Sequence, residues 1–274
     1  PNTGAIHLSA GADVTTQYNF RGMNLEDQGF ILQPWVEITS QIYSGDALAP
    51  VIEGVALKAG LWNSIQDASP GTQGHPQWFE ADVSAGVVLD LPYNLTGEVM
   101  YVSLEDPEFP GNYAEEVDLT LAYDDSGLWE GVLDMPGFEG LQPHVLVVIE
   151  TDGASDGVGN GGDVYYEIGI EPSVCVLESA DWPVTLSVPM TIAFGDNYYE
   201  YTNSSGAADD DSFGYFDVGL VCSVPLKFVP VEHGQWEAYA GVHFLFKGDG
   251  AEALTTNAST DDSEIIGSAG ISMS

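Results

Sequence analysis

Segments of about ten residues in which apolar and polar side chains alternate recur along the whole chain, each followed by a cluster of Gly, Asp, Asn, Pro or Ser. Because successive side chains of a β-strand point to opposite faces, this alternation predicts strands with one apolar and one polar face. No helical periodicity competes with it. The predicted strands span residues 5–21, 30–43, 52–64, 78–90, 95–103, 114–123, 141–151, 163–171, 183–194, 213–227, 235–246 and 263–273.

The two faces of these segments differ in charge as well as in polarity. In 78–90, Val83 and Val87 belong to the apolar face, whereas Glu80 and Asp82 belong to the other. A soluble β-sandwich also alternates, but here the polar face carries acids in mid-strand and the apolar face carries almost no charge away from strand ends. No run of about 18 apolar residues exists, so the sequence excludes a transmembrane helix. Only a closed barrel then satisfies the backbone in lipid.

We therefore predict an all-β fold in which residues 1–274 form one transmembrane antiparallel β-barrel of about 12 strands, surrounded by outer-membrane lipid. Long connections, acidic on the whole, lie near 22–29, 64–77, 104–113, 151–162, 195–212 and 247–262, and short ones near 44–51, 91–94 and 228–234. This asymmetry predicts long acidic external loops. The connections 124–140 and 172–182 break the rule, either because they carry small subdomains or because the strand map is wrong there.

The charge balance is extreme, with 43 Asp and Glu residues against 4 Lys and Arg and a formal net charge of −39. Nucleic acid is excluded as a partner, because no basic surface is available to displace counterions from phosphates. Such a chain repels itself unless salt or bound cations screen it, which suggests a saline or calcium-containing setting. A content of 11% aromatic residues argues against disorder.

The polar face of the predicted barrel would line its lumen. The pore-lining acids predicted in this way are Glu37, Glu80, Asp82, Glu98, Glu116, Asp118, Glu167, Asp217 and Glu237, and the bases are Arg21, Lys58 and Lys247. Because acids dominate, an open lumen would prefer cations, and the bases would compensate charge.

Clusters of carboxylates outside the strands could supply the oxygen ligands that Ca²⁺ prefers. The candidate metal ligands are Glu105, Asp106, Glu108, Asp209, Asp210, Asp211, Asp261 and Asp262. Solvated anionic loops are the other interpretation. No other cofactor is expected.

Cys175 and Cys222 are the only cysteines, and their positions near the same end of nearby strands suggest a disulfide bond, although two free thiols stay open as the alternative.

Two further patterns concern the outer face. Small residues at Ala81, Ala85, Ala238 and Ala240 suggest flat patches for homo-oligomerisation, as a trimer or a larger ring. Aromatic residues near strand ends predict interfacial girdles. They are Trp35, Trp62, Trp78, Tyr93, Trp182, Tyr198, Tyr199 and Trp236.

No catalytic constellation is present, so we do not expect an enzyme. The sequence has no G-x-S-x-G elbow, P-loop or C-x-x-C motif, and its five histidines lack metal-ligand spacing. The chain begins at Pro1 without an apolar signal segment, which we interpret as a mature exported product whose signal peptide has been removed.

Four short motifs in order, Tyr18–Gly22, Gly60–Ser64, Trp78–Asp82 and Tyr198–Glu200, resemble those of an uncharacterised porin-like outer-membrane β-barrel family of Gram-negative bacteria, of the proteobacterial and planctomycete type. The resemblance implies a barrel in the bacterial outer membrane and provides no catalytic residues. The last residue, Ser274, departs from the aromatic residue that ends many such barrels.

Three functions follow as hypotheses. The first is a cation-preferring diffusion channel. The second is a structural outer-membrane protein that forms a homo-oligomer or a lattice bridged by divalent cations. The third is a secreted ligand-binding β-sandwich. The sequence does not separate the first two, because a lumen of this size is either open or filled by its own side chains.

Overall fold

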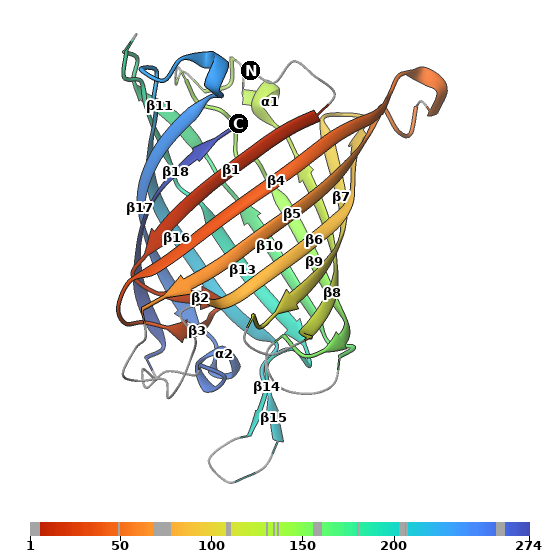
Figure 1. Cartoon of the computed structure of the whole chain (residues 1–274), viewed down its shortest axis with the longest axis vertical. Helices are drawn as coiled ribbons and strands as arrows, with labels where there is room; N and C mark the ends of the chain where they lie inside the picture. The colour runs from red at the N-terminus through yellow and green to blue at the C-terminus, as the bar shows by residue number, and fades with distance from the viewer. Residues whose placement is uncertain are drawn as a thin grey trace.

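Twelve antiparallel strands close into a barrel in the computed structural model, which confirms the predicted fold class and excludes the sandwich (Figure 1). The ladder closes because β16 (Phe213–Pro225) pairs with β17 (Trp236–Lys247) as well as with the strand on its other side, and because β1 (Ile6–Thr15) pairs with both β18 (Ser263–Met273) and β4 (Ile31–Ser44). The structure describes residues 6–48, 50–67, 78–107, 111–129, 131–133, 135, 137–155, 161–179, 181–202, 206, 208–255 and 261–274.

The strands lie close to their predicted positions. The wall consists of β1 (Ile6–Thr15), β4 (Ile31–Ser44), β5 (Gly54–Gln66), β6 (Trp78–Leu91), β7 (Leu95–Glu105), β8 (Asn112–Tyr123), β9 (His144–Gly153), β10 (Val164–Ile170) continued by β11 (Ser173–Leu177), β12 (Val184–Ser187) continued by β13 (Met190–Asp196), β16 (Phe213–Pro225), β17 (Trp236–Lys247) and β18 (Ser263–Met273). Pro172 and Pro189 stand where the two composite strands are interrupted, since proline has no N–H for the ladder.

The two ends of the barrel carry different elements. The loop end bears β2 (Tyr18–Phe20), β3 (Met23–Glu26), β14 (Glu200–Thr202), β15 (Ala208–Asp210) and α2 (Asp249–Ala253). The opposite end, here the terminal end, bears η1 (Asp46–Leu48), α1 (Ser126–Trp129), η2 (Val231–His233) and both ends of the chain (Figure 1). The prediction that residues 5–21 form one strand is wrong at its end, because β1 stops at Thr15 and the chain then folds into β2.

The long connection between β8 and β9 is a small folded unit that extends the wall. The Asp125 carboxylate accepts hydrogen bonds from the Trp129 indole at 2.7 Å and from the N–H groups of Leu141 and Gln142 at 2.9 Å. Burial alone would raise the pKa of Asp125, but these donors hold its pKa below the ordinary value. Phe138 forms a β-bridge with Val174 of β11. The strand map is therefore correct at 124–140, where the connection carries a subdomain. It is wrong at 172–182, because β11 continues the wall through residues that were predicted to form a connection.

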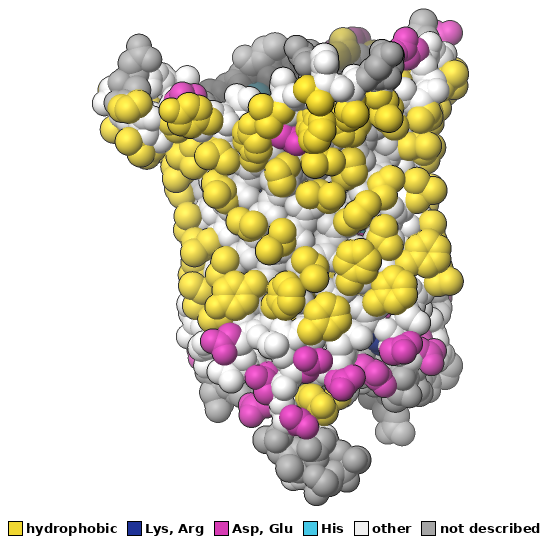
Figure 2. Space-filling view, turned by 180° about the vertical axis from the view of Figure 1, so that it is seen from behind, with side chains coloured by type: hydrophobic (Ala, Val, Ile, Leu, Met, Phe, Trp, Pro, Cys, Tyr) yellow, Lys and Arg dark blue, Asp and Glu magenta, His cyan; other side chains and the backbone are white. Residues whose placement is uncertain are grey.

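The outer wall is an apolar band, with acidic side chains beyond it at the loop end (Figure 2). Ile38 is 49% exposed, Val83 50% and Leu220 49%, and their strands lie in different parts of the wall. So much exposed apolar surface around the whole molecule fits contact with lipid rather than water. No helix within the described ranges is long and apolar enough to cross a membrane.

The predicted aromatic girdles need correction in part, because Trp78, Tyr93 and Trp182 are exposed but other rings of the set are not. Trp35 and Trp62 are paired in register and share the inner face, because their neighbours Val36 and Leu61 are paired on the outer one. Tyr198 and Tyr199 are completely buried. Outward rings at the loop end instead include Phe216 and Phe246, which stack with centroids 6.2 Å apart. The sequence pattern could not tell these roles apart, because an aromatic ring near a strand end suits either a lipid boundary or a packed interior.

Large inward side chains lie flat against glycines of the neighbouring strand. A Cβ atom at Gly11 would approach the Trp35 ring to 2.7 Å, one at Gly270 would approach Tyr239 to 2.6 Å, and one at Gly219 would approach His243 to 2.6 Å. The same relation holds between Gly169 and His144. Because only glycine leaves room for these rings, bulky residues lie along the wall instead of projecting across the lumen.

Gly11→Val is therefore expected to lower the free energy of unfolding by about 1–3 kcal/mol, since the new side chain overlaps the Trp35 ring. Guanidinium unfolding in detergent would measure it. The matched control is Gly97→Val, where a Cβ meets nothing closer than 3.4 Å. Equal stability of the two variants would contradict the packing argument.

Candidate functional site: the barrel interior

The register places all the predicted pore-lining strand residues on the inner face. In β6, Val83 lies outward against Leu61, so Glu80 and Asp82 of alternate parity lie inward. By the same reasoning the inner face carries Glu37, Lys58, Glu98, Glu116, Asp118, Glu167, Asp217, Glu237 and Lys247. Further inward acids that sequence reasoning did not assign to the lumen are Asp13, Asp90, Glu150 and Glu264. A role in conduction stays a prediction for every one of them.

Lys58 and Lys247 each contact carboxylates. Lys58 Nζ lies 3.0 Å from Glu37 and 3.2 Å from Glu98, and this group is partly exposed to the lumen. Lys247 Nζ lies 2.6 Å from Glu264, and both side chains are almost completely buried. The bases therefore compensate charge, as their acidic surroundings predicted.

Two histidines also lie against inward carboxylates. His243 Nδ1 is 2.7 Å from Asp217 and His144 Nε2 is 3.7 Å from Glu167.

The mouth hairpin, which we define as β2, β3 and the turn between them (Tyr18–Glu26), lies at the loop end of the barrel and packs against its wall. The turn places Arg21 and Gly22 at φ angles of 48° and 88°, and a Cβ at Gly22 would lie 2.8 Å from the Tyr215 ring. Glycine at this position permits both the left-handed conformation and the close approach. Tyr18, Met23, Asn24 and Glu26 are each at most 4% exposed, so the hairpin is a buried element.

Arg21 anchors the mouth hairpin to the wall. Its guanidinium donates to both carboxylate oxygens of Glu116 at 2.6 and 2.7 Å and also to the hydroxyl of Tyr198 at 2.9 Å. The rings of Phe20 and Tyr165 lie 4.7 and 5.0 Å from its central carbon. A bidentate pair with stacked rings is the geometry that arginine provides and lysine does not.

The Ser155 hydroxyl connects Arg21 to a second carboxylate, that of Glu150. Arg21 donates to Ser155 Oγ at 3.2 Å, and Ser155 Oγ donates to Glu150 Oε1 at 2.6 Å. The Tyr199 hydroxyl donates to the Arg21 carbonyl at 3.0 Å. Charge, hydroxyls and backbone therefore hold the turn of the hairpin in one position.

The flanks of the hairpin contact other strands. Tyr18 donates to Glu80 of β6 at 2.6 Å, and Tyr113 of β8 donates to the other oxygen of the same carboxylate. On its other flank, Asn24 donates at 3.1 Å to Glu264 of β18, the partner of Lys247. Because β18 lies opposite β8, which carries the Arg21 partner Glu116, the hairpin spans the mouth.

The first of the four motifs contacts each of the other three at this mouth. The Tyr18 ring lies 5.4 Å from the Trp62 ring and its hydroxyl bonds to Glu80 of the third motif, while Tyr198 of the fourth contacts Arg21 of the first. The residues that prompted the family resemblance are thus largely those that hold the mouth hairpin.

Several residues of this site were missed from the sequence. Tyr113, Ser155, Tyr165, Tyr215 and Asn24 belong to it. The available signal was an Arg–Gly turn in a chain whose acids greatly outnumber its bases, since buried carboxylates such as Glu116 require a cation.

The predicted calcium ligands do not converge. Among the described ranges, no group of three or more His, Cys, Asp or Glu side chains is placed to hold a metal ion. Asp211 accepts the N–H groups of Phe213 and Asp249, so it holds the start of α2. Asp209 and Asp210 lie on β15, Glu105 accepts a hydrogen bond from Ser103, and Asp262 from Ser263. Asp106 and Asp261 lie in other connections, and Glu108 lies outside the described residues. Calcium binding stays a prediction.

The predicted disulfide bond is not formed. Cys175 and Cys222 are free thiols. Cys175 is paired with Thr185 of β12, whereas Cys222 is paired with the next residue, Leu186, so β12 lies between them and they point to opposite faces.

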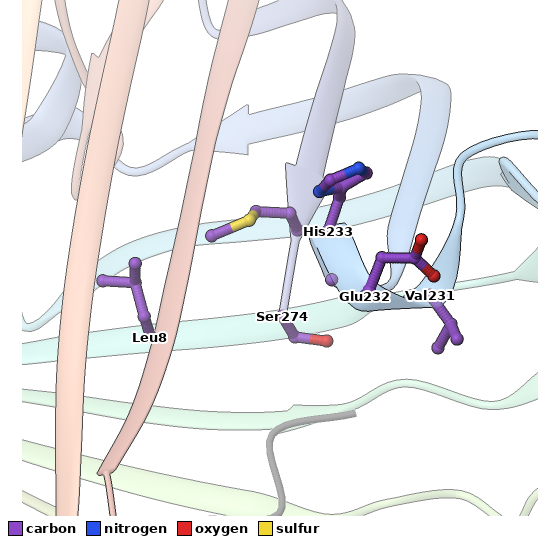
Figure 3. Close-up of a pocket in the computed structure, with 7 residues that line it drawn as sticks. Leu8, Val231, Glu232, His233 and Ser274 are labelled. Carbon is purple, nitrogen blue, oxygen red and sulfur yellow. The ribbon is translucent and has the colours of Figure 1, made fainter.

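Two of the cavities at the terminal end share Met273 and Ser274 in their linings. One of about 390 Å³ is lined by Leu8, Glu232, His233 and their neighbours; its lining includes the outward side chain of Leu8 and the turn that carries η2 (Figure 3). The other, of about 260 Å³, is lined mainly by inward residues, including Trp35 and Glu237.

No family model and no curated protein matches this sequence, so the family-level resemblance stays a prediction. Solved structures with a similar overall barrel include the NanC porin, at 10% identity and a TM-score of 0.45 over 98% of this chain and 100% of that one. An outer-membrane channel from Pseudomonas putida F1 gives 9% identity and a TM-score of 0.46 over 98% and 93%. The transport unit of the autotransporter AIDA-I from Escherichia coli gives 12% and 0.41 over 100% and 91%. What the structure itself shows is a closed antiparallel β-barrel of twelve strands.

Proposed function

We propose that this protein is a cation-preferring channel of the bacterial outer membrane whose loop end is narrowed by the mouth hairpin. The observation that carries the proposal is the distribution of inner charge. Arg21, Lys58 and Lys247 are all engaged by carboxylates. Acids remain in excess on the same wall, and Asp118 and Asp217 each keep one buried carboxylate oxygen without a partner in the described chain.

Confinement strengthens the effect of these charges. At an effective dielectric constant near 20, unit charges about 4 Å apart interact by about 4 kcal/mol, against about 1 kcal/mol in water. Screening acts over about 8 Å at physiological ionic strength, so cation preference should persist there and weaken in concentrated salt.

The reversal potential of single channels across a KCl gradient tests the proposal. We expect a reversal potential with the sign of the K⁺ equilibrium potential. The double variant Asp118→Asn with Asp217→Asn should move the reversal potential toward zero, because both carboxylates face the lumen. Asp209→Asn with Asp210→Asn is the matched control, since β15 projects from the barrel (Figure 1). An anion-selective sign would contradict the proposal.

The packed mouth also favours a second candidate, a sealed structural barrel in a homo-oligomer or a lattice bridged by divalent cations. Met23, Tyr198 and Tyr199 are at most 1% exposed there. Wild-type protein that inserts into bilayers but never conducts would favour this function. Neither candidate involves catalysis.

Oligomerisation belongs to both candidates, and we propose a trimer or a larger ring. Ala85 and Ala240 lie on the exposed outer face, where small side chains let another barrel approach closely. Native mass spectrometry in mild detergent is expected to show this mass, and a monomer would refute it.

A further inference from the structure

The cavity of about 260 Å³ at the terminal end lies between an aromatic ring and a carboxylate. Trp35, Gly11, Ser272 and Glu237 are successive cross-strand partners on β4, β1, β18 and β17, so they form one row across the inner wall. The Trp35 ring lies over Gly11, which has no side chain, and Ser272 is the next residue in the row. No large side chain therefore stands between Trp35 and Glu237 in this row, which leaves space for the cavity.

Four polar side chains of this cavity have no partner in the described chain. Within the described chain, no hydrogen bond or ion pair engages the Trp35 indole N–H, the Glu237 carboxylate or the hydroxyls of Ser9 and Ser272. The contrast with the rest of the wall is clear, because Glu37, the nearest acid on β4, is engaged by Lys58. A row of free donors and acceptors around a cavity is the arrangement expected of a binding site.

The charge of the cavity selects the class of ligand. Its lining contains no Lys, Arg or His, and Glu237 is the charged side chain in it. An aromatic face attracts weakly hydrated cations and covers their carbon atoms, while a carboxylate adds Coulomb attraction. We propose that the cavity between Trp35 and Glu237 binds a small organic ammonium ion on the inner wall of the barrel.

This site goes beyond the proposed channel, since binding does not require conduction. Isothermal titration calorimetry of the detergent-solubilised protein with choline at low ionic strength tests it directly. We expect saturable binding, and we expect Trp35→Leu and Glu237→Gln each to weaken it about tenfold, because each removes one of the two attractive groups. Trp35→Phe keeps an aromatic face and should retain most of the affinity, which separates a binding role from loss of the fold.

Asp90→Asn is the matched control, because it removes an inward carboxylate on β6, which does not line the cavity and is separated by β5 from the strand that carries Trp35. It is expected to leave choline binding unchanged. The proposal is overturned if choline does not bind, if Glu237→Gln binds it as well as the wild type, or if uncharged glucose binds equally tightly.

Discussion

Arg21→Ala is expected to raise single-channel conductance several-fold or more. The substitution removes a bidentate pair whose carboxylate, Glu116, is 1% exposed, and breaking such a buried pair costs about 3–5 kcal/mol. The same change removes the ring contacts with Phe20 and Tyr165. Since these interactions fix the turn of the mouth hairpin, its loss should free the hairpin from the wall and widen the loop end.

Planar-bilayer recordings of the two proteins would measure the change. Arg21→Lys keeps the positive charge but cannot form the bidentate pair with Glu116, so an intermediate conductance is expected. Lys227→Ala serves as a control, because it removes a cation from the terminal end, where conductance should not change. A correctly folded Arg21→Ala barrel with wild-type conductance would show that the hairpin does not limit the pore.

Lys247→Met is expected to lower the free energy of unfolding by about 3–5 kcal/mol. The 2.6 Å pair with Glu264 is buried at both partners, and the variant leaves that carboxylate with Asn24 alone. Replacing both partners, as Lys247→Met with Glu264→Leu, should recover much of the loss, because a buried pair exchanged for apolar residues is often neutral.

Guanidinium unfolding in detergent would give the three free energies. Lys58→Met is the comparison: its partner Glu37 is 40% exposed, so an effect of about 1 kcal/mol or less is expected. A Lys247→Met variant as stable as Lys58→Met would argue against the buried pair as a stabilising element.

Strand number and facing could be predicted from the sequence because both depend on local alternation, which each segment displays independently. The mouth hairpin could not. Apolar and polar residues keep alternating through Tyr18, so nothing local marks the end of β1 at Thr15. The disulfide prediction failed for a related reason: proximity of Cys175 and Cys222 along the barrel says nothing about which face each thiol occupies until the register with β12 is known.

The packing of inward rings against glycines could not be predicted from the sequence either. Gly11 lies under Trp35 only because β1 and β4 pair in one particular register. A periodicity argument treats each strand separately, whereas such packing depends on two strands together.

The mouth hairpin also constrains the order in which the molecule can be assembled. It lies early in the chain, yet Arg21 bonds to residues 95 and 177 positions away and Asn24 to one 240 positions away. Contacts between such distant segments close large loops and form late. A chain that still lacks β18 has no Glu264 to bond with Asn24. The contacts of the mouth hairpin can therefore be completed only after the whole chain has been synthesised and the wall has closed.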